Sequence, residues 1–278
     1  MDIAYSLAGS YLLLGTAIGL VTWYTFAQLF SSHESNQWGD KVLKIAIVLA
    51  GLGVILAILH LGRMERFFNL IANPHSWLSR EGLCAGAFTG GIMLYYLLVR
   101  NKWQEAGKYR LLLYAVVTAG LATFISMGMI YASAHAIPAW NTTLVVLVNI
   151  FSGLLLGGLL FLVLVKDNLS VPVFKTLTIS LLIVSVVSIM INVAYEAHIS
   201  MALTSLALQG VAVPSVWLGT LVRVIVGLLV PAYLIIKLMS DQSAKAATYL
   251  SITLACVIVG EITAKLMHFI VGVKAPFL

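Results

Sequence analysis

Apolar residues gather in eight long runs that shorter polar segments separate. A membrane-spanning helix needs about 20 mostly apolar residues, and each run meets or approaches that length. The pattern therefore predicts an all-α, polytopic membrane protein. Its bundle of eight transmembrane helices is expected at residues 5–30, 41–61, 82–99, 109–131, 143–165, 173–195, 216–239 and 246–272.

Most of the chain lies inside these runs, so we predict a single transmembrane bundle domain over residues 1–278 and no soluble domain. The composition agrees, because 61% of the residues are hydrophobic and 9% are charged. Soluble domains carry roughly 25% charged residues. No basic segment precedes the first run and no small-residue cleavage site follows it, so we interpret that run as a retained helix.

The basic residues predict the orientation of the bundle. An even number of spans places both termini on the same side of the membrane. Ten of the sixteen Lys and Arg residues lie in connections after odd-numbered runs, and four follow even-numbered runs. The positive-inside rule then places the odd connections in the cytoplasm. Both termini are therefore expected on the outer side of the bacterial inner (cytoplasmic) membrane, which is the periplasm if the cell is a Gram-negative bacterium.

Two of the outer connections are long and amphipathic. Residues 62–81 and 196–215 mix apolar side chains with polar ones. Segments of this kind lie along the membrane interface or form a docking surface.

Ionisable residues inside or beside the predicted helices concentrate toward the outer side. In the last run, Glu261, Lys265 and His268 share one helix face because their spacing is i, i+4, i+7. The inner half of the bundle has almost no titratable group. The outer set consists of His60, Arg63, Glu81, His135, Glu196, His198, Arg223, Glu261, Lys265 and His268.

A polar cluster in one leaflet of an apolar bundle suits an amphiphile such as a quinol. The tail of a quinol prefers lipid, whereas its head group needs hydrogen-bond partners and proton acceptors. Oxidation releases two electrons and two protons, and histidine or a desolvated carboxylate can accept a proton near neutral pH. His60 and Glu81 are the candidates, because they bracket the 62–81 connection and the fold could bring them together.

Each of these residues, taken singly, also has a structural explanation that involves no quinol. A single histidine at a helix end is more often an interfacial cap than a ligand. Glu261 and Lys265 have the i, i+4 order that stabilises helices and could pair with each other. Arg223 could be a counter-ion for Glu196 or Glu261. Residues of the interfacial belt could account for Asn69, Trp77 and Trp140.

Haem is the cofactor to test. His60 could share one outer haem with His135, His198 or His268. Two haems stacked across the membrane are excluded, because the inner half offers no histidines for the second. Cys84 and Cys256 both fall inside apolar runs, and two cysteines cannot ligate an iron–sulfur cluster.

An ordered set of short strings resembles the membrane-anchor subunits of the dimethyl sulfoxide reductase family. The resemblance covers nearly the whole chain, whereas each string alone is weak. Arg63, Glu65 and His268 depart from the family pattern. The strings are His60-Leu61-Gly62, then Arg66, Phe68 and Asn69, Ser76-Trp77-Leu78-Ser79-Arg80-Glu81, Pro138-Ala139-Trp140, Glu196, Arg223 and Gly260-Glu261.

The resemblance implies a menaquinol-oxidising anchor without haem or iron–sulfur clusters of its own. Such anchors hold a four-cluster iron–sulfur subunit and a molybdopterin catalytic subunit on the periplasmic side, and they pass electrons to the nearest cluster. His60 and Glu81 are then the groups that act on the quinol, and no metal site is expected. The implied quinol-binding set is His60, Arg66, Asn69, Ser79, Glu81 and Trp140, supported by Arg63, Glu196, Arg223, Glu261 and Lys265.

Two other functions stay open on the residues alone. One is a haem b quinol anchor of a related respiratory complex. The other is a secondary transporter with Arg223, Glu261 and Lys265 on its path, although transporter sites are built between repeats and no internal repeat stands out.

The chain alone is not expected to be an enzyme, because its quinol half-reaction needs an electron sink. The partner would choose the terminal acceptor, so dimethyl sulfoxide, trimethylamine oxide and selenate all fit.

Overall fold

The computed structural model describes residues 2–30, 35–60, 73–240 and 245–274. Within them, eight helical spans are long and apolar enough to cross a membrane, and no β-strand is present. The predicted all-α polytopic bundle is therefore confirmed. The spans are α1 (Asp2–Ala27), α2 (Ser35–His60), α4 (Trp77–Val99), α5 (Arg110–Ala132), α6 (Leu144–Val165), α7 (Val171–Leu208), the series α8 (Trp217–Leu221), η4 (Val222–Leu229) and α9 (Val230–Ser240), and α10 (Ala246–Lys274).

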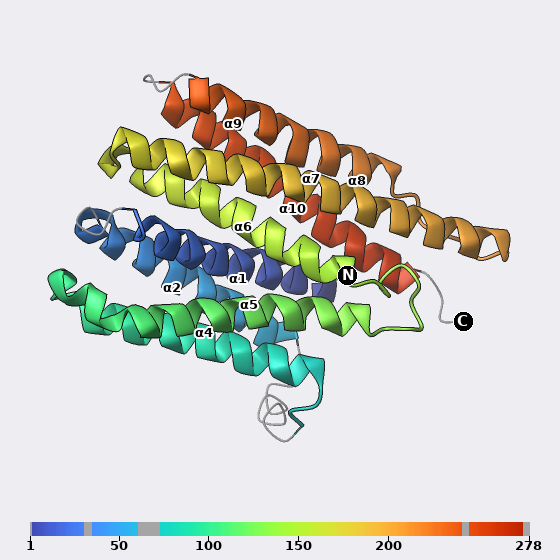
Figure 1. Cartoon of the computed structure of the whole chain (residues 1–278). Coiled ribbons are helices and arrows are strands. Elements are labelled where there is room, and N and C mark those ends of the chain that lie inside the picture. The colour runs from blue at the N-terminus through green and yellow to red at the C-terminus, as the bar shows by residue number, and fades with distance from the viewer. Residues whose placement is uncertain (1, 31–34, 61–72, 241–244, 275–278) are drawn as a thin grey trace.

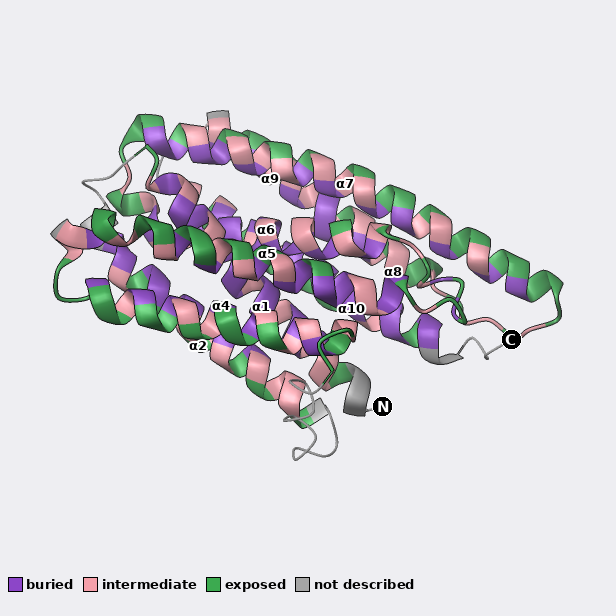
Figure 2. Ribbon diagram, turned by 60° about the horizontal axis from the view of Figure 1, so that its bottom comes forward, coloured by how far each residue is buried: buried purple, intermediate pink, exposed green. Residues whose placement is uncertain are grey.

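Helices α1 and α6 form the centre of the bundle. In the most apolar stretch of each, 61% of the residues are buried, compared with 28% in α2 and α4. Figure 1 shows α1 and α6 between a flank of α4 and α5 and a flank of α7 and α9. Buried faces turn toward this centre (Figure 2). The outward faces carry exposed apolar side chains such as Leu111, Ile183 and Met190, as expected of surfaces that contact lipid.

Small residues bring α1 and α6 into backbone contact. Gly15 and Gly19 of α1 face Gly153 and Gly157 of α6. Both pairs have the small-xxx-small spacing that lets membrane helices approach closely. A side chain at Gly19 would overlap the backbone of Gly153, so this crossing depends on the missing Cβ.

Replacing Gly19 by Leu is expected to lower the free energy of unfolding by about 1–3 kcal/mol, the usual cost of overpacking a core. Thermal unfolding of the purified protein in detergent measures the change. Gly86→Leu is the control, because Gly86 is exposed and a Cβ there meets nothing within 4 Å. Equal melting temperatures for the two variants would contradict the role of the α1–α6 contact.

The seventh span changes its helical geometry near its start. After the single turn of α8, the segment η4 is a π-helix, and regular α-helix resumes in α9. Such π turns are rare and frequently occur at functional sites. The π segment contains Arg223, and at Gly227 a Cβ would lie 2.7 Å from the Cα of Gly260 in α10. This close approach brings Arg223 within reach of α10.

Helix α4 begins earlier than the sequence pattern predicted. The expected connection ran to residue 81, but the helix starts at Trp77, so Ser79 and Glu81 are helical. The guanidinium of Arg80 lies 4.4 Å from the Trp77 ring centroid, and its Nε donates to the carbonyl of Pro74. These contacts stabilise the start of the helix. The sequence pattern missed this start because the first turns contain charged residues and are not part of an apolar run.

Helix α7 continues beyond its predicted end at residue 195 to Leu208, through about two thirds of the connection expected at 196–215. Gly210, with a φ of 80°, ends it: the N–H groups of Gly210 and Val211 donate to the carbonyls of Ala207 and Leu206. The 38 residues of α7 are about 57 Å long, whereas the hydrocarbon core of a membrane is about 30 Å thick. Figure 1 shows the last turns of α7 projecting beyond the neighbouring helices.

Candidate functional site

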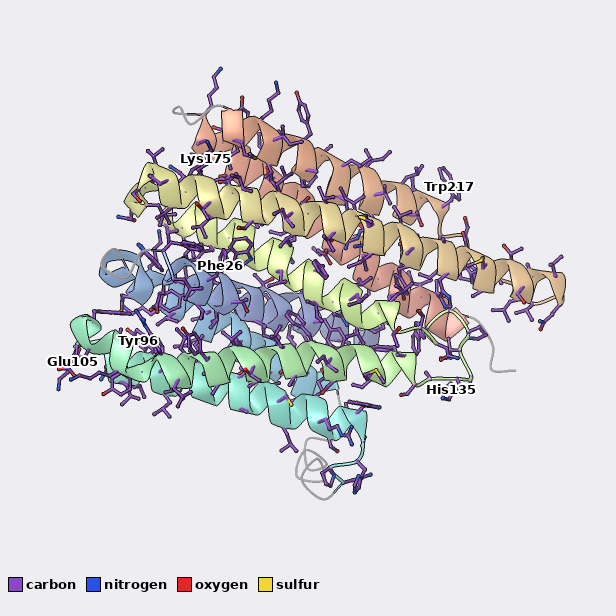
Figure 3. The ribbon with its side chains drawn as sticks, viewed as in Figure 1. Phe26, Tyr96, Glu105, His135, Lys175 and Trp217 are labelled. Carbon is purple, nitrogen blue, oxygen red and sulfur yellow. The ribbon has the colours of Figure 1, made fainter. Side chains whose placement is uncertain are left out.

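The first turns of α1, α4, α6 and α8 and the last turns of α5, α7 and α10 meet at one end of the bundle, which we call the site end (Figure 1). In Figure 3, His135 and Trp217 lie at this end, whereas Glu105, Tyr96 and Lys175 lie at the opposite end. The first and the last helices therefore emerge together, as an even number of spans requires. Which side of the membrane the site end faces stays a prediction.

A buried ion pair links η4 to α10. The Nη1 atom of Arg223 lies 2.5 Å from Oε1 of Glu261, and both side chains are fully buried. Arg223 also donates from Nε and Nη2 to Oδ1 of Asn192 in α7, at 3.2 and 3.1 Å. Asn192 in turn donates to the carbonyl of Ser188 at 2.8 Å. The charge of Arg223 is thus met by three polar contacts, so this pair fits the structural counter-ion that the sequence offered as one explanation.

Lys265, one turn after Glu261, makes a separate contact. Its Nζ donates to Oδ1 of Asn149 in α6 and lies 5.8 Å from the centroid of the Tyr11 ring in α1. The alternative in which Glu261 pairs with Lys265 is therefore not the arrangement found: Glu261 pairs with Arg223, and Lys265 with Asn149. Lys265 connects three helices at the site end.

Glu81 lies one turn inside α4 and is buried, with 8% of its surface exposed. Its Oε2 accepts a hydrogen bond of 3.5 Å from the hydroxyl of Tyr11. Ser79, on the same first turns, is buried as well. Tyr11 therefore stands between the carboxylate of Glu81 and the ammonium of Lys265.

His268, one turn beyond Lys265 in α10, lies in an aromatic cage. Its Nδ1 is 2.7 Å from the hydroxyl of Tyr195, and its ring stacks on Trp140 with centroids 5.3 Å apart. Tyr131 packs edge-on against the imidazole at 4.6 Å. The indole of Trp140 donates to the carbonyl of His268 at 2.8 Å, so the connection between α5 and α6 is tied to α10.

Glu196 and His198, two further polar residues of the site end, have local partners. Thr220 donates to Oε2 of Glu196 at 2.9 Å. His198 Nε2 lies 3.0 Å from the carbonyl of Pro138, and His135 is exposed. Glu196 thus interacts with the start of the seventh span, while Arg223 has Glu261 as its partner.

A cavity of about 480 Å³, counting its open mouth, lies among these groups. A second cavity of about 230 Å³ lies beside it, and the two share Tyr11, Asn149 and Lys265. Asn149 Nδ2 and His268 Nε2 are buried and have no hydrogen-bond partner among the described residues. The polar side chains that line the larger cavity are Tyr11, Tyr131, Asn149, Asn192, Tyr195, Glu196, Lys265 and His268.

The structure brings most of the predicted site residues to one end, and their roles stay predictions. The side chain of His60, the last residue of α2, lies outside the described part, as do residues Arg63, Arg66 and Asn69. Trp140 contacts His268 rather than Glu81. Of the predicted set, the site end holds Ser79, Glu81, Trp140, Glu196, Arg223, Glu261 and Lys265.

The side chains that connect these groups were not predicted from the sequence. Asn149 and Asn192 are single amides inside otherwise apolar runs, and such residues usually hydrogen-bond across helices. That signal could have identified both residues. Tyr11, Tyr131 and Tyr195 carried no such signal, because tyrosine is common in apolar runs and only the packing shows its partners.

Comparisons with known proteins place the chain next to one family. The family model described as "DMSO reductase anchor subunit (DmsC)" matches residues 4–270. A relative from Haemophilus influenzae, one of the chains of its anaerobic dimethyl sulfoxide reductase, is 29% identical over 152 residues. That alignment covers 52% of this chain and 52% of the relative, so it spans about half the length of the curated protein.

Proposed function

Because this chain belongs to the family of DMSO reductase anchor subunits, we propose that it anchors a respiratory reductase and oxidises menaquinol at the site end. The expected partners are a four-cluster iron–sulfur subunit, which takes the electrons, and a molybdopterin catalytic subunit. Both would dock on the periplasmic face of the inner membrane. The chain then supplies one half-reaction and has no turnover without its electron acceptor.

The observation that carries this proposal is the buried polar cluster around one cavity at one end of an apolar bundle. Buried ionisable groups in a membrane are costly, so those without a structural partner are functional candidates. Glu81 is buried with a single long hydrogen bond to Tyr11. Asn149 and His268 each keep an unpartnered polar atom in the part of the chain that the structure covers. A quinol head group needs proton acceptors and hydrogen-bond partners of these kinds.

Roles follow for the individual residues. Glu81 accepts a proton from the quinol, and His60, at the end of α2, either shares that task or orients the ring. Ser79 and Trp140 line the region, with Arg63, Arg66 and Asn69 in the adjoining connection. The Arg223–Glu261 pair joins η4 to α10, Lys265 joins α10 to α6, and Glu196 joins α7 to α8, so these residues hold the helices in place around the site.

The test is quinol-dependent reduction of the iron–sulfur subunit. A complex with this chain should reduce its clusters on addition of a soluble menaquinol analogue. The same two partners without the chain should respond only to an artificial low-potential donor. Cluster reduction by quinol without this chain would overturn the proposal.

We expect the purified chain to carry no haem. Its visible absorption spectrum should then lack a Soret band, in both the oxidised and the dithionite-reduced state. A Soret band in stoichiometric amount would favour the haem b anchor, in which histidines of the site end ligate iron. Cells grown with an inhibitor of haem synthesis provide the control. If the chain needs no haem, the complex should assemble in these cells as it does without the inhibitor.

A further inference from the structure

Tyr11 is the side chain that connects the cavity with the buried carboxylate. Its ring lines both cavities, and its hydroxyl donates to Oε2 of Glu81 at 3.5 Å. The residue is buried, with 5% of its surface exposed. Glu81 itself does not line either cavity. A molecule in the larger cavity therefore reaches this carboxylate through Tyr11.

The larger cavity presents polar groups suited to a quinol ring. Its volume of about 480 Å³ includes the open mouth, so a ring would occupy the mouth as well as the enclosed part. Asn149 Nδ2 and His268 Nε2 are available for hydrogen bonds with ring oxygens. Apolar walls are provided by Val145, Val148 and Ile199.

We propose that the quinol ring occupies this cavity and that Tyr11 transfers its proton to Glu81. This inference rests on the proposed function. In each transfer, the O–H bond of Tyr11 breaks as Glu81 takes that proton, and the Tyr11 oxygen gains the proton of a quinol hydroxyl. The two electrons leave one at a time to an iron–sulfur cluster of the partner subunit, and the product is the quinone. Glu81 releases its proton to water at the site end between transfers.

The position of Glu81 agrees with this route. It lies in the second turn of α4, and the preceding residues Asn73, Pro74 and His75 are exposed. The hydrogen bond from Tyr11 is long, but catalytic hydrogen bonds are often long before substrate binds. The Nζ atom of Lys265 lies over the Tyr11 ring, 5.8 Å from its centroid.

Tyr11→Phe tests the transfer because it removes only the hydroxyl. The edge-on packing of this ring with Tyr131 and Phe269, at 6.1 and 6.4 Å, is kept. In the intact complex we expect kcat with menaquinol analogue to fall about 100-fold, the usual effect of lost acid–base catalysis. KM should change little, and the solvent deuterium isotope effect on kcat should increase. Turnover with an artificial donor should stay normal.

Tyr24→Phe is the matched control. Tyr24 is fully buried at the opposite end, and its hydroxyl, unlike that of Tyr11, has no hydrogen-bond partner among the described residues. Quinol turnover in this variant should equal that of the unmodified complex. A Tyr11→Phe complex with kcat within twofold of the control would overturn the transfer step.

Val148→Phe tests the position of the ring. Val148 is buried on α6 and lines the cavity, so a larger side chain should raise the quinol KM at least tenfold. Leu147→Phe, on the exposed neighbouring position, should leave KM unchanged. An unchanged KM in Val148→Phe would place the ring elsewhere.

A third variant, Glu81→Gln, separates this inference from the proposed function. If Glu81→Gln stops quinol turnover while Tyr11→Phe and Val148→Phe act normally, only this inference fails. If all three variants act normally, the proposed function fails too.

Discussion

Replacing Glu81 by Gln should reduce quinol-dependent turnover of the assembled complex about 100-fold or more. Glutamine has the same shape and can still accept the hydrogen bond from Tyr11, so assembly should be preserved. It cannot accept a proton, however, and positioned acid–base groups contribute about 10²–10⁴-fold to rates. Steady-state assays with a menaquinol analogue measure the loss, and an artificial donor to the partner subunits should still support full turnover.

Glu105→Gln is the control for this experiment. Glu105 lies at the opposite end (Figure 3) and forms an exposed ion pair of 3.1 Å with Lys108. It has no part in the proposed chemistry, so its quinol turnover should match the unmodified complex. A Glu81→Gln complex that oxidises quinol at the normal rate would remove Glu81 from the site.

Replacing Arg223 by Met should destabilise the bundle by about 3–5 kcal/mol, because removing one partner leaves a buried charge uncompensated. Glu261 and Asn192 would lose their contacts to the guanidinium. Glu261→Leu should cost a similar amount for the same reason. The double variant should recover much of the loss, since well-packed apolar side chains often replace a buried ion pair without cost.

Unfolding midpoints in detergent, measured for the two single variants and the double variant, give these differences. Lys44→Met is the control, because the Lys44–Asp40 pair is exposed and such pairs contribute about 0–1 kcal/mol. A double variant no more stable than either single variant would contradict the account of this pair as a mutually compensating unit.

The fold could be predicted from the sequence because membrane helices are visible as long apolar runs. All eight runs correspond to spans in the structure. Two errors at the site end concern helix ends that charged or half-apolar residues concealed. Glu81 was expected at the end of a connection but lies within α4, and α7 continues to Leu208. In both places the helix extends beyond the apolar run, before its start in α4 and after its end in α7. Hydropathy alone therefore makes both helices too short.

The candidate site could be predicted only in part. The concentration of ionisable residues at one end followed from counting, and Glu81, Arg223, Glu261 and Lys265 were identified that way. Their partners were not, because each contact joins helices distant in sequence. Lys265 meets Asn149 across 116 positions, and Tyr11 meets Glu81 across 70. Only the packing of the helices decides which polar side chains face one another.

The central claim is that a quinol binds at the site end, within the cavity that α1, α5, α6, α7 and α10 line. Photolabelling of the intact complex with a photoreactive menaquinone analogue, followed by peptide mass spectrometry, tests it most directly. We predict label on residues 145–149, 192–199 and 264–268, which contain cavity-lining side chains, and loss of that label with excess menaquinol. Competable label at the opposite end, around Tyr24 and Tyr95, or an even distribution over lipid-facing helices would contradict the claim.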